Sequence, residues 1–349
     1  MNTFGTRLRL TTFGESHGKA MGGVIDGFPP GFKIDFDRLQ KEINKRRPGL
    51  SPLTSGRCEE DFPEFLSGIS ENGISLGTPI GFIIKNKDAR PDDYREKALR
   101  PNHADYTYLK KYGYPQLSGG GRASARETVN WVTAGAIVIQ WLESLGIKIF
   151  TTLSAAGKVD ESNIFKPYVK GYQEADKFKE EADEKLLNEI KEAKISGESI
   201  GGKVSCLILG LQPGVGEPVF SKLHSRLAAA MMSINAAKGF EYGAGFESTT
   251  MTGAQSSDFF YIDEGLDNDF KTITNYSGGV QGGISNGMPV FFTVAFKPTP
   301  TYLHPIKTID IERNKVTIPP KGRHDPCVAM RAVPVVKAMT ALTIADFLV

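Results

Sequence analysis

Residues 327–348 carry almost only apolar side chains, which predicts a long helix that is either buried or part of a subunit interface. A second long apolar helix is predicted for residues 123–145, where the pattern stops at Gly146. Neither segment contains a run of about 18 consecutive apolar residues, so no membrane-spanning helix is expected. The fold must therefore cover two largely apolar helices.

Shorter elements lie between these two helices. Helical spacing predicts further helices at 35–45, 173–194 and 220–232, and β-type runs predict strands at 23–26, 80–84, 147–150, 204–208 and 290–294. The elements mix without a regular βαβ repeat, so we expect an α+β layered fold rather than a doubly wound sheet. No linker divides the chain, and we expect residues 1–349 to form a single domain.

Composition restricts the partners and the compartment. The chain is 40% apolar and 23% charged with a net charge of +2, so no nucleic-acid or membrane partner is expected. Its three cysteines, Cys58, Cys206 and Cys327, form no C-x-x-C pair, which argues against a disulfide framework and a zinc site; no metal site is expected. No signal peptide follows Met1, and a cytoplasmic location is the expectation.

Two histidines lie in polar, glycine- or asparagine-containing segments that could border a cleft. His17 lies in the segment Thr-Phe-Gly-Glu-Ser-His-Gly, and His103 lies in Arg-Pro-Asn-His-Ala-Asp-Tyr. An imidazole titrates near neutral pH and can donate or accept a proton in catalysis. The alternative for each is an ordinary histidine in a solvated turn.

A glycine loop precedes the predicted helix at 123–145 and indicates an anion site. Backbone N–H groups and the helix dipole favour an anion at such a point, and Arg122, Ser124 and Arg126 add a hydroxyl and two cations. The spacing fits neither a Walker loop nor G-x-G-x-x-G. A simple turn is the alternative.

The segment Lys-Gly-Arg-His-Asp-Pro-Cys ends at Cys327 and places a cation, an imidazole and a carboxylate in succession. Asp325 could be catalytic, or it could cap the last helix, with Pro326 at the first helical position. Cys327 is disfavoured as a nucleophile because its apolar neighbours suggest burial.

Several cations lie in or beside glycine and proline turns, although the net charge is close to zero. This arrangement suggests one anionic pocket whose arginines could clamp a ligand with carboxylates and a phosphate. The cations are Arg46, Arg47, Arg57, Arg100, Arg122, Arg126, Lys297 and Arg323.

Together, these segments resemble the chorismate synthase family. The matching blocks follow the family's order from residue 14 to 326; they are residues 14–18, 46–49, 103–105, 119–128, 233–239, 278–283, 297–299 and 322–326. The resemblance implies a β-α-β sandwich-like subunit, a homotetramer, and the conversion of 5-enolpyruvylshikimate 3-phosphate to chorismate and phosphate. That reaction is a 1,4-anti elimination that requires reduced FMN without net redox change.

The resemblance also implies roles for individual residues. His17 corresponds to the general acid near the leaving phosphate, His103 to the proton partner of the reduced flavin ring, and Asp325 to the carboxylate that works with flavin N5 as base. Arg46, Arg126 and Arg323 correspond to substrate anchors. The FMN-binding positions are Arg122, Ala123, Ser124, Asn235, Ala236, Gly282, Lys297, Pro298, Thr299, Pro300, Thr301 and Arg323.

One departure from the family concerns the reductant. Many relatives have an arginine, associated with NADPH, where this chain has Leu50, Ser51 and Pro52. NADPH is therefore expected only as an external or weakly bound reductant. A flavin reductase and a nucleic-acid-binding protein are the competing functions, and the near-zero net charge disfavours the second.

Overall fold

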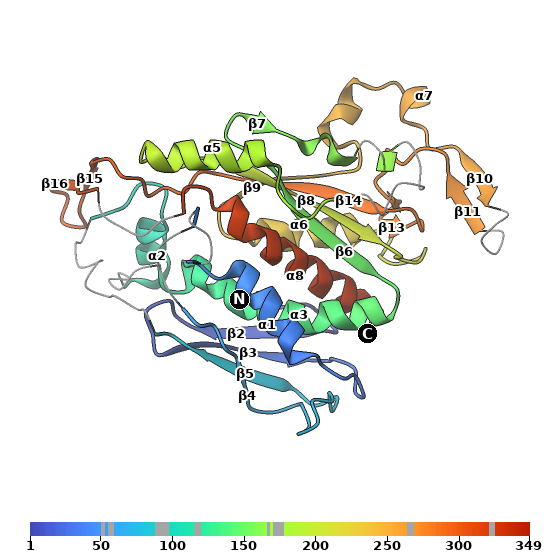
Figure 1. Cartoon of the computed structure of the whole chain (residues 1–349), viewed down its shortest axis with the longest axis horizontal. Coiled ribbons are helices and arrows are strands. Elements are labelled where there is room, and N and C mark those ends of the chain that lie inside the picture. Colours follow the sequence, from blue (N-terminus) through green and yellow to red (C-terminus); the bar gives the residue numbers. More distant parts are fainter. Residues whose placement is uncertain are drawn as a thin grey trace.

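Two antiparallel five-stranded sheets enclose a layer of helices (Figure 1). This computed structural model describes residues 1–49, 53–54, 59–87, 98–114, 120–165, 168–169, 178–263, 269–320 and 325–349. The layered α+β arrangement confirms the expected fold class and has the β-α-β order that the resemblance implies.

The first sheet has the strand order β1-β2-β3-β5-β4. Its strands are β1 (Thr3–Phe4), β2 (Arg9–Gly14), β3 (Ala20–Asp26), β5 (Ile80–Lys85) and β4 (Glu64–Phe65). Side chains of β2 alternate between exposed and buried, as expected for a sheet with one face on the core. Leu10 pairs with Ile25 across β2 and β3, and this register places both side chains in the core.

The second sheet has the order β7-β6-β8-β14-β9. Its strands are β7 (Val159–Asp160), β6 (Lys148–Ala156), β8 (Gly202–Leu209), β14 (Val290–Phe296) and β9 (Ala237–Tyr242). The strands β6, β8 and β14 are almost wholly buried because elements cover both of their faces. One face packs on the helical layer, and α5 (Glu184–Ile195) contacts β6 and β7.

The helical layer contains α1 (Phe36–Arg46), α3 (Thr128–Ser144), α6 (Leu223–Met232) and α8 (Ala329–Leu348). A carboxylate oxygen of Asp35 accepts the Arg38 N–H at 2.9 Å and caps α1, one residue from the predicted start. The helices α3 and α8 touch at Gly135, where an added Cβ would lie 2.4 Å from the Ala338 Cβ. Glycine is therefore required for this close approach.

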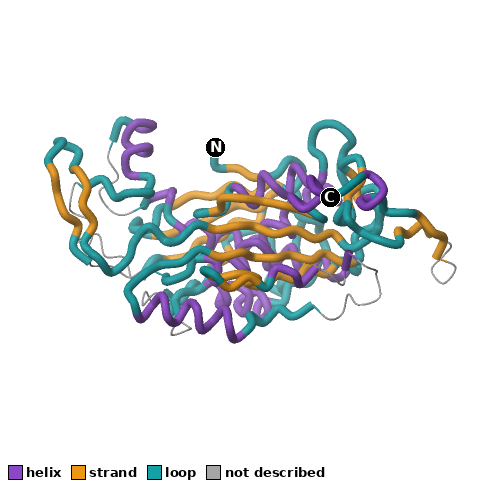
Figure 2. Tube along the Cα trace, turned by 90° about the horizontal axis from the view of Figure 1, so that it is seen from above, coloured by secondary structure: helices purple, strands orange, loops and turns teal. Residues whose placement is uncertain are grey.

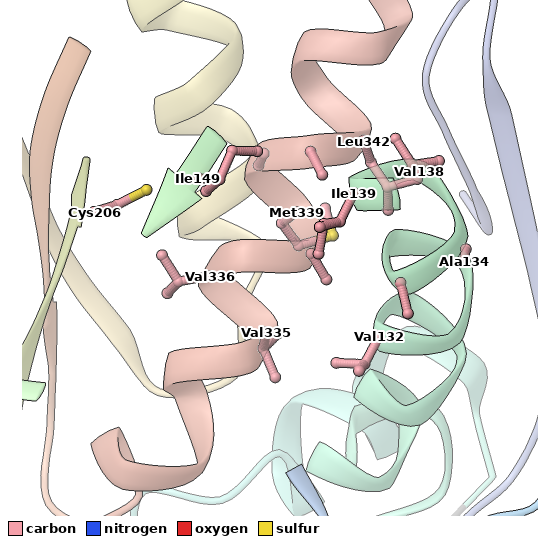
Figure 3. Close-up of a cluster of buried hydrophobic side chains, with 14 of the residues drawn as sticks. Val132, Ala134, Val138, Ile139, Ile149, Cys206, Val335, Val336, Met339 and Leu342 are labelled. Atoms are coloured by element: carbon pink, nitrogen blue, oxygen red, sulfur yellow. The ribbon is translucent and has the colours of Figure 1, made fainter. Parts of the chain in front are cut away.

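Apolar side chains of α3 and α8 interdigitate with residues of β6 and β8 in the centre of the molecule (Figure 3). The prediction that residues 327–348 form a buried helix is confirmed, with the helix starting at Ala329. Lys337, the buried cation of α8, is paired with Glu180 at 2.9 Å. None of the described helices combines the length and apolarity that a bilayer-spanning segment needs.

Of the predicted helices, 173–194 and 123–145 differ most from the observed starts, while α6 begins at Leu223 rather than at residue 220. Residues 178–183 of the predicted helix 173–194 are not helical, and α5 begins at Glu184 because the Asp183 carboxylate caps it. Phe178 packs instead in a buried aromatic cluster with Phe165, Tyr168 and Phe291. Residues 173–177 lie outside the described part of the chain. Residues 123–127 form 3-10 turns, and regular α3 starts only at Thr128.

Smaller elements project from the two ends of the long axis (Figure 2). Helix α2 (Asp105–Tyr112) and the hairpin β15 (Ile306–Ile309) with β16 (Lys315–Ile318) lie at one end. The hairpins β10 (Phe260–Asp263) with β11 (Asp269–Thr272) and β12 (Val280–Gln281) with β13 (Ile284–Ser285) lie toward the other, together with α7 (Gly253–Ser256). The remaining 3-10 segments are Ser162–Phe165 and Gly245–Thr250.

Candidate active site

His17 lies in the connection between β2 and β3, which a single asparagine holds in place. The side-chain amide of Asn86, directly after β5, donates to the carbonyl oxygens of Glu15 at 3.0 Å and Gly18 at 2.8 Å. The buried Ser16 hydroxyl lies 2.9 Å from His17 Nδ1. These bonds fix the backbone on both sides of His17 and restrict its ring.

Asn86 also connects this loop to a buried cluster of charges. Its Oδ1 accepts a hydrogen bond from Arg126 Nε at 3.0 Å, and Arg126 Nη1 forms an ion pair with Asp61 Oδ1. The second oxygen of Asp61 accepts from Arg46 Nη2 at 2.7 Å. Asp61 therefore bridges Arg46 and Arg126, two arginines that are 80 positions apart in the sequence.

The cluster leaves hydrogen-bonding capacity unused. Arg46 and Arg126 are 1% and 4% exposed, yet Arg46 Nε and Arg126 Nη2 have no hydrogen-bond partner among the described residues. Glu59 Oε2 lies 3.9 Å from Arg126 Nη2, which is an ion-pair distance but too long for a hydrogen bond. The two unsatisfied donors in this cluster are available to an anionic ligand.

Burial and neighbouring charges shift the pKa values of this cluster. Burial, together with the cations of Arg331 and Arg126, lowers the pKa of Arg46 to about 9, although Asp61 opposes the change. Burial alone would raise the pKa of Asp61, but Arg46 and Arg126 outweigh it and hold that pKa below the usual range. Arg46 and Asp61 are therefore both charged at neutral pH.

Asp325 reaches the same cluster from the other side. Its Oδ2 accepts from Arg331 Nη1 at 2.7 Å, and Arg331 Nε donates to the backbone carbonyl of Arg46 at 3.0 Å. The alternative that Asp325 caps the last helix is wrong, because α8 begins at Ala329 and its N-cap position is Val328.

Cys327 is buried, and burial raises the pKa of its thiol to about 11, in agreement with the prediction that it is not a nucleophile.

His103 lies in the turn before α2 and faces the segment that follows β14. Its Nδ1 is 3.1 Å from the carbonyl oxygen of Pro101, so we assign the proton to Nδ1. The other ring nitrogen, Nε2, then accepts from the Thr301 hydroxyl at 3.3 Å. Burial, and then the Arg100 cation, lower the pKa of His103, so its ring is neutral at pH 7.

The segment 297–301 connects His103 to Asp325. Lys297 Nζ donates to the carbonyl oxygen of Asn102 at 2.9 Å, and the Thr299 hydroxyl donates to the backbone carbonyl of Asp325 at 2.9 Å. A continuous series of hydrogen bonds and chain connections thus runs from the His17 loop through the arginine cluster to Asp325 and His103. This series links the three candidate catalytic residues to one another.

A cavity of about 540 Å³ opens beside the His17 loop. The loop contributes Glu15 and Gly18, and α2, which follows His103, contributes Tyr108 and Tyr112. The remaining wall residues are Asn2, Thr12, Phe13, Gly14, Lys19, Ala20 and Arg122. Burial, and then the Glu15 carboxylate, raise the pKa of Tyr108.

Most of the predicted FMN-binding positions adjoin one another. The side-chain amide of Asn235 donates to the carbonyl oxygen of Ala123 at 3.0 Å, and the Lys297 N–H donates to the carbonyl oxygen of Ala236 at 3.0 Å. Ala236 has a φ of 68°, a value that non-glycine residues rarely adopt. Segments 123–124, 235–236 and 297–301 therefore meet at one place, although more than 170 positions separate the first from the last.

The residues at this meeting point fit a flavin nucleotide. Asn235 Oδ1 is a buried acceptor without a partner among the described residues. A flavin ring, its ribityl hydroxyls and its phosphate offer matching donors and acceptors. Among the described residues, no group of three or more histidine, cysteine or acidic side chains could hold a metal ion.

Arg122, one cation of the predicted anion site at the start of α3, is already paired within the chain. Arg122 Nη1 donates to Gly14 O and Glu127 Oε2, and its Nη2 donates to Thr12 and Asn2. The carboxylate of Glu127 therefore pairs with Arg122 and neutralises its charge. Burial raises the pKa of Glu127. Flavin contacts from this segment would come from the backbone or from Ser124.

Gly282, a predicted FMN-binding position, lies apart from these segments. Gly282 lies in the β12–β13 hairpin, next to Gly283, whose carbonyl oxygen accepts the Leu223 N–H at the start of α6. Asn235 follows the other end of α6, and a helix of this length spans about 15 Å. Gly282 is therefore remote from Asn235 within one chain. Arg323 lies outside the described residues, as do Arg57 and residues 50–52.

Sequence reasoning missed three residues that organise the site: Asp61, Asn86 and Arg331. Only Arg331 carries a signal that could have been noticed, because a cation in the first turn of a helix opposes the helix dipole. Asp61 and Asn86 lie in ordinary polar surroundings in the sequence.

Known proteins resemble this chain over its whole length. A sequence model of the family described as chorismate synthase matches residues 8–349. The chorismate synthase of Phocaeicola vulgatus is 49% identical over 351 residues, covering 99% of this chain and 97% of that protein. For Christiangramia forsetii the identity is 48% over 358 residues, with the same coverage. A solved structure titled "Crystal Structure of Chorismate Synthase" matches with a TM-score of 0.75 at 29% identity, over 99% of this chain and 92% of that one. With its sequence and its sandwich both matching over nearly their full extent, this chain belongs to the chorismate synthase family.

Proposed function

We propose that the chain performs its chorismate synthase reaction with His17, His103 and Asp325 as the groups that move protons. The observation that carries this proposal is the connection of hydrogen bonds and ion pairs between the His17 loop and Asp325. It runs through Asn86, Arg126, Asp61, Arg46 and Arg331. The reaction belongs to the shikimate pathway, and its substrate is 5-enolpyruvylshikimate 3-phosphate.

The elimination requires two changes at opposite faces of the substrate ring. A C–O bond to phosphate breaks, a ring C–H proton leaves, and the electron pair forms the second double bond of a conjugated diene. The departing phosphate gains negative charge, which His17 stabilises by donating a proton. Asp325, a carboxylate held by Arg331, supports removal of the ring proton.

Three arginines anchor the anionic substrate. Arg46 and Arg126 each present an unpaired N–H from a buried guanidinium that Asp61 holds in place. Such charge-assisted bonds suit carboxylate and phosphate oxygens. Arg323 is assigned here by its family position only.

Reduced FMN, when bound, supplies electron density that assists departure of the phosphate and of the ring proton. Ala123, Ser124, Asn235, Ala236 and residues 297–301 would hold it, with Arg122 contributing its backbone. His103, neutral at pH 7 with its proton on Nδ1, presents Nε2 toward Thr301 at this edge and can accept a proton there. NADPH acts at most as an external or weakly bound reductant.

A homotetramer would account for the exposed apolar side chains at the end of the molecule that carries the β10–β11 hairpin. Apolar side chains of the β10–β11 hairpin and its flanks are exposed, among them Phe259 at 63%, Phe260 at 61% and Phe270 at 64%. An exposed apolar group of this size favours contact with another subunit. A second copy would then be the source of any contact between Gly282 and the flavin.

The chain is further proposed to be a single cytoplasmic domain, residues 1–349. The helices α3 and α8 pack between both sheets, so the two sheets share one core. Cys206 and Cys327 are free and buried, as expected in a reducing compartment.

An anaerobic assay with reduced FMN and 5-enolpyruvylshikimate 3-phosphate tests the reaction. Chorismate, measured by its absorbance, and released phosphate should form in equal molar amounts. No stoichiometric reductant should be consumed. Continuous oxidation of reduced flavin or NADPH in step with product would instead identify a net redox enzyme.

A further inference from the structure

We propose that Arg331 is a positioning residue that holds the Asp325 carboxylate in its working orientation and couples it to Arg46. This inference rests on the proposed role of Asp325. Arg331 touches neither the substrate nor the reacting atoms in this assignment, and it acts through Asp325.

The geometry ties three segments together through one guanidinium. Arg331 Nη1 donates to Asp325 Oδ2 at 2.7 Å, and its Nε donates to the carbonyl oxygen of Arg46 at 3.0 Å. Arg46 lies in the last turn of α1, Arg331 in the first turn of α8, and Asp325 in the connection before α8. A rigid planar fork with two fixed acceptors restricts rotation of the Asp325 carboxylate.

Helix stability does not explain this cation. A positive charge in the first turn of a helix opposes the positive end of the helix dipole, and α8 has neither an acidic residue in that turn nor a side-chain cap. Arg331 is also partly exposed, with 18% of its side chain accessible, so apolar packing alone does not require it. The ion pair with Asp325 and the bond to Arg46 are what its position provides.

Coupling to Arg46 has a chemical consequence. Arg46 carries an unpaired donor that is assigned to a substrate anion, and Asp325 is assigned to the ring proton. Because Arg331 bonds to the Asp325 carboxylate and to the backbone carbonyl of Arg46, it links the base to the turn of α1 that carries the anion-binding side chain. A displacement of about 1 Å at a reacting group can cost roughly 10²-fold in rate.

The test compares Arg331→Met with Arg331→Lys and with a matched control. Arg226→Met removes the cation of another ion pair of α8, that with Asp346, which lies near the opposite end of the helix. Anaerobic turnover, KM, thermal unfolding and the affinity for oxidised FMN by fluorescence quenching are measured for all three variants. These quantities separate rate, substrate binding, folding and flavin binding.

We expect Arg331→Met to lower kcat roughly 10²-fold, with KM changed by less than about threefold, because misplacement of the base affects the chemical step. Arg331→Lys should recover about tenfold of that loss, since it keeps a charged donor without the fork. Affinity for FMN should stay at the wild-type value in both. Arg226→Met should keep the wild-type kcat while unfolding at a lower temperature.

A double-mutant cycle with Asp325→Ala decides between the alternatives. If Arg331 acts through Asp325, Arg331→Met should not slow the Asp325→Ala enzyme further. Wild-type kcat for Arg331→Met, additive losses in the double mutant, or a raised KM with unchanged kcat would each overturn the proposal. Should Arg331→Met not fold, Arg331→Lys takes its place in the cycle. The proposal then requires that Arg331→Lys be slower than the wild type, and that the double mutant Arg331→Lys with Asp325→Ala have the same kcat as Asp325→Ala alone. Any other result overturns it. Wild-type activity of Asp325→Ala alone would overturn the proposed function, and with it this inference.

Discussion

Helix α8 is flanked by two buried carboxylates that are used in different ways. Near its C-terminal end, Asp346 accepts the backbone N–H groups of Thr6, Arg7 and Leu8 and pairs with Arg226. Beside its N-terminal end, Asp61 lies between Arg46 and Arg126, and Arg331 connects Arg46 to the helix. Between Arg331 and Asp346 the helix rises by about 22 Å.

The difference lies in what each cluster leaves unpaired. Among the described residues, no buried polar atom of Asp346 or Arg226 lacks a partner, whereas Arg46 Nε and Arg126 Nη2 do. A cluster that serves only the fold satisfies its own groups, because each unsatisfied buried group costs stability. We propose that the cluster beside Asp61 keeps that capacity for a ligand.

The largest expected effect is a loss of turnover without a loss of folding. Asp325→Ala should lower kcat by about 10²-fold or more, in line with loss of a general base, while far-UV circular dichroism stays that of the folded protein. His17→Ala and His103→Ala should behave in the same way. Wild-type turnover in all three variants would remove the catalytic assignments.

Near the C-terminal end of α8 we expect the reverse, a loss of stability without a loss of turnover. Asp346→Asn leaves three backbone N–H groups and Arg226 without a carboxylate, and should lower the free energy of unfolding by about 2–3 kcal/mol. Below the melting temperature its kcat/KM should equal that of the wild type. Urea denaturation and steady-state assays measure the two effects, and a large loss of turnover in the folded variant would break the contrast between the two ends.

A smaller effect is expected when one guanidinium of the ligand-facing cluster is shortened. Arg126→Lys can keep the charge beside Asp61 but loses the second arm and the bond to Asn86, so KM should rise about tenfold, as for loss of one charge-assisted hydrogen bond. Arg226→Lys is the matched change at the other end and should leave KM unchanged. Equal KM values for the two variants would mean that Arg126 does not bind substrate.

The smallest expected effect concerns the protonation of His103. Burial, and then Arg100, lower its pKa, so NMR titration should give a value below the ordinary 6.5, and Arg100→Gln should move that value upward. In the unfolded chain His103 takes up its proton first as the pH falls, so its contribution to stability decreases from about pH 6.5 toward the folded-state pKa. His103→Gln should remove this part of the pH dependence, and an unchanged stability profile would contradict the shift.

Local patterns predicted the regular elements better than their starts. The helix at 327–348 and the strand at 290–294 were both located correctly, because an apolar run of sufficient length allows few alternatives. The start at residue 173 was wrong because Asp183 caps α5 and Phe178 finds a place in an aromatic cluster instead. Capping and packing partners of this kind are not visible in helical spacing.

In the candidate site, too, some residues could be named from the sequence and others only from the structure. His17, His103, Asp325 and the flavin-binding segments could be named from motifs and from the family resemblance. Asn86, Asp61 and Arg331 could not, although they connect those residues to one another. Within the predicted anion site at the start of α3, Arg122 is paired with Glu127, a carboxylate of the same motif, and helical spacing did not reveal this pairing.

The sequence by itself determined the family, the two apolar helices and the residue types that carry the chemistry. Only the tertiary structure decided which charges are paired, which donors stay free, and that Gly282 is remote from Asn235 in one chain. The physical reason is range: hydrogen bonds and ion pairs act over about 3 Å. Sheet register and the packing of α3 against α8 set those distances between residues that the sequence places far apart.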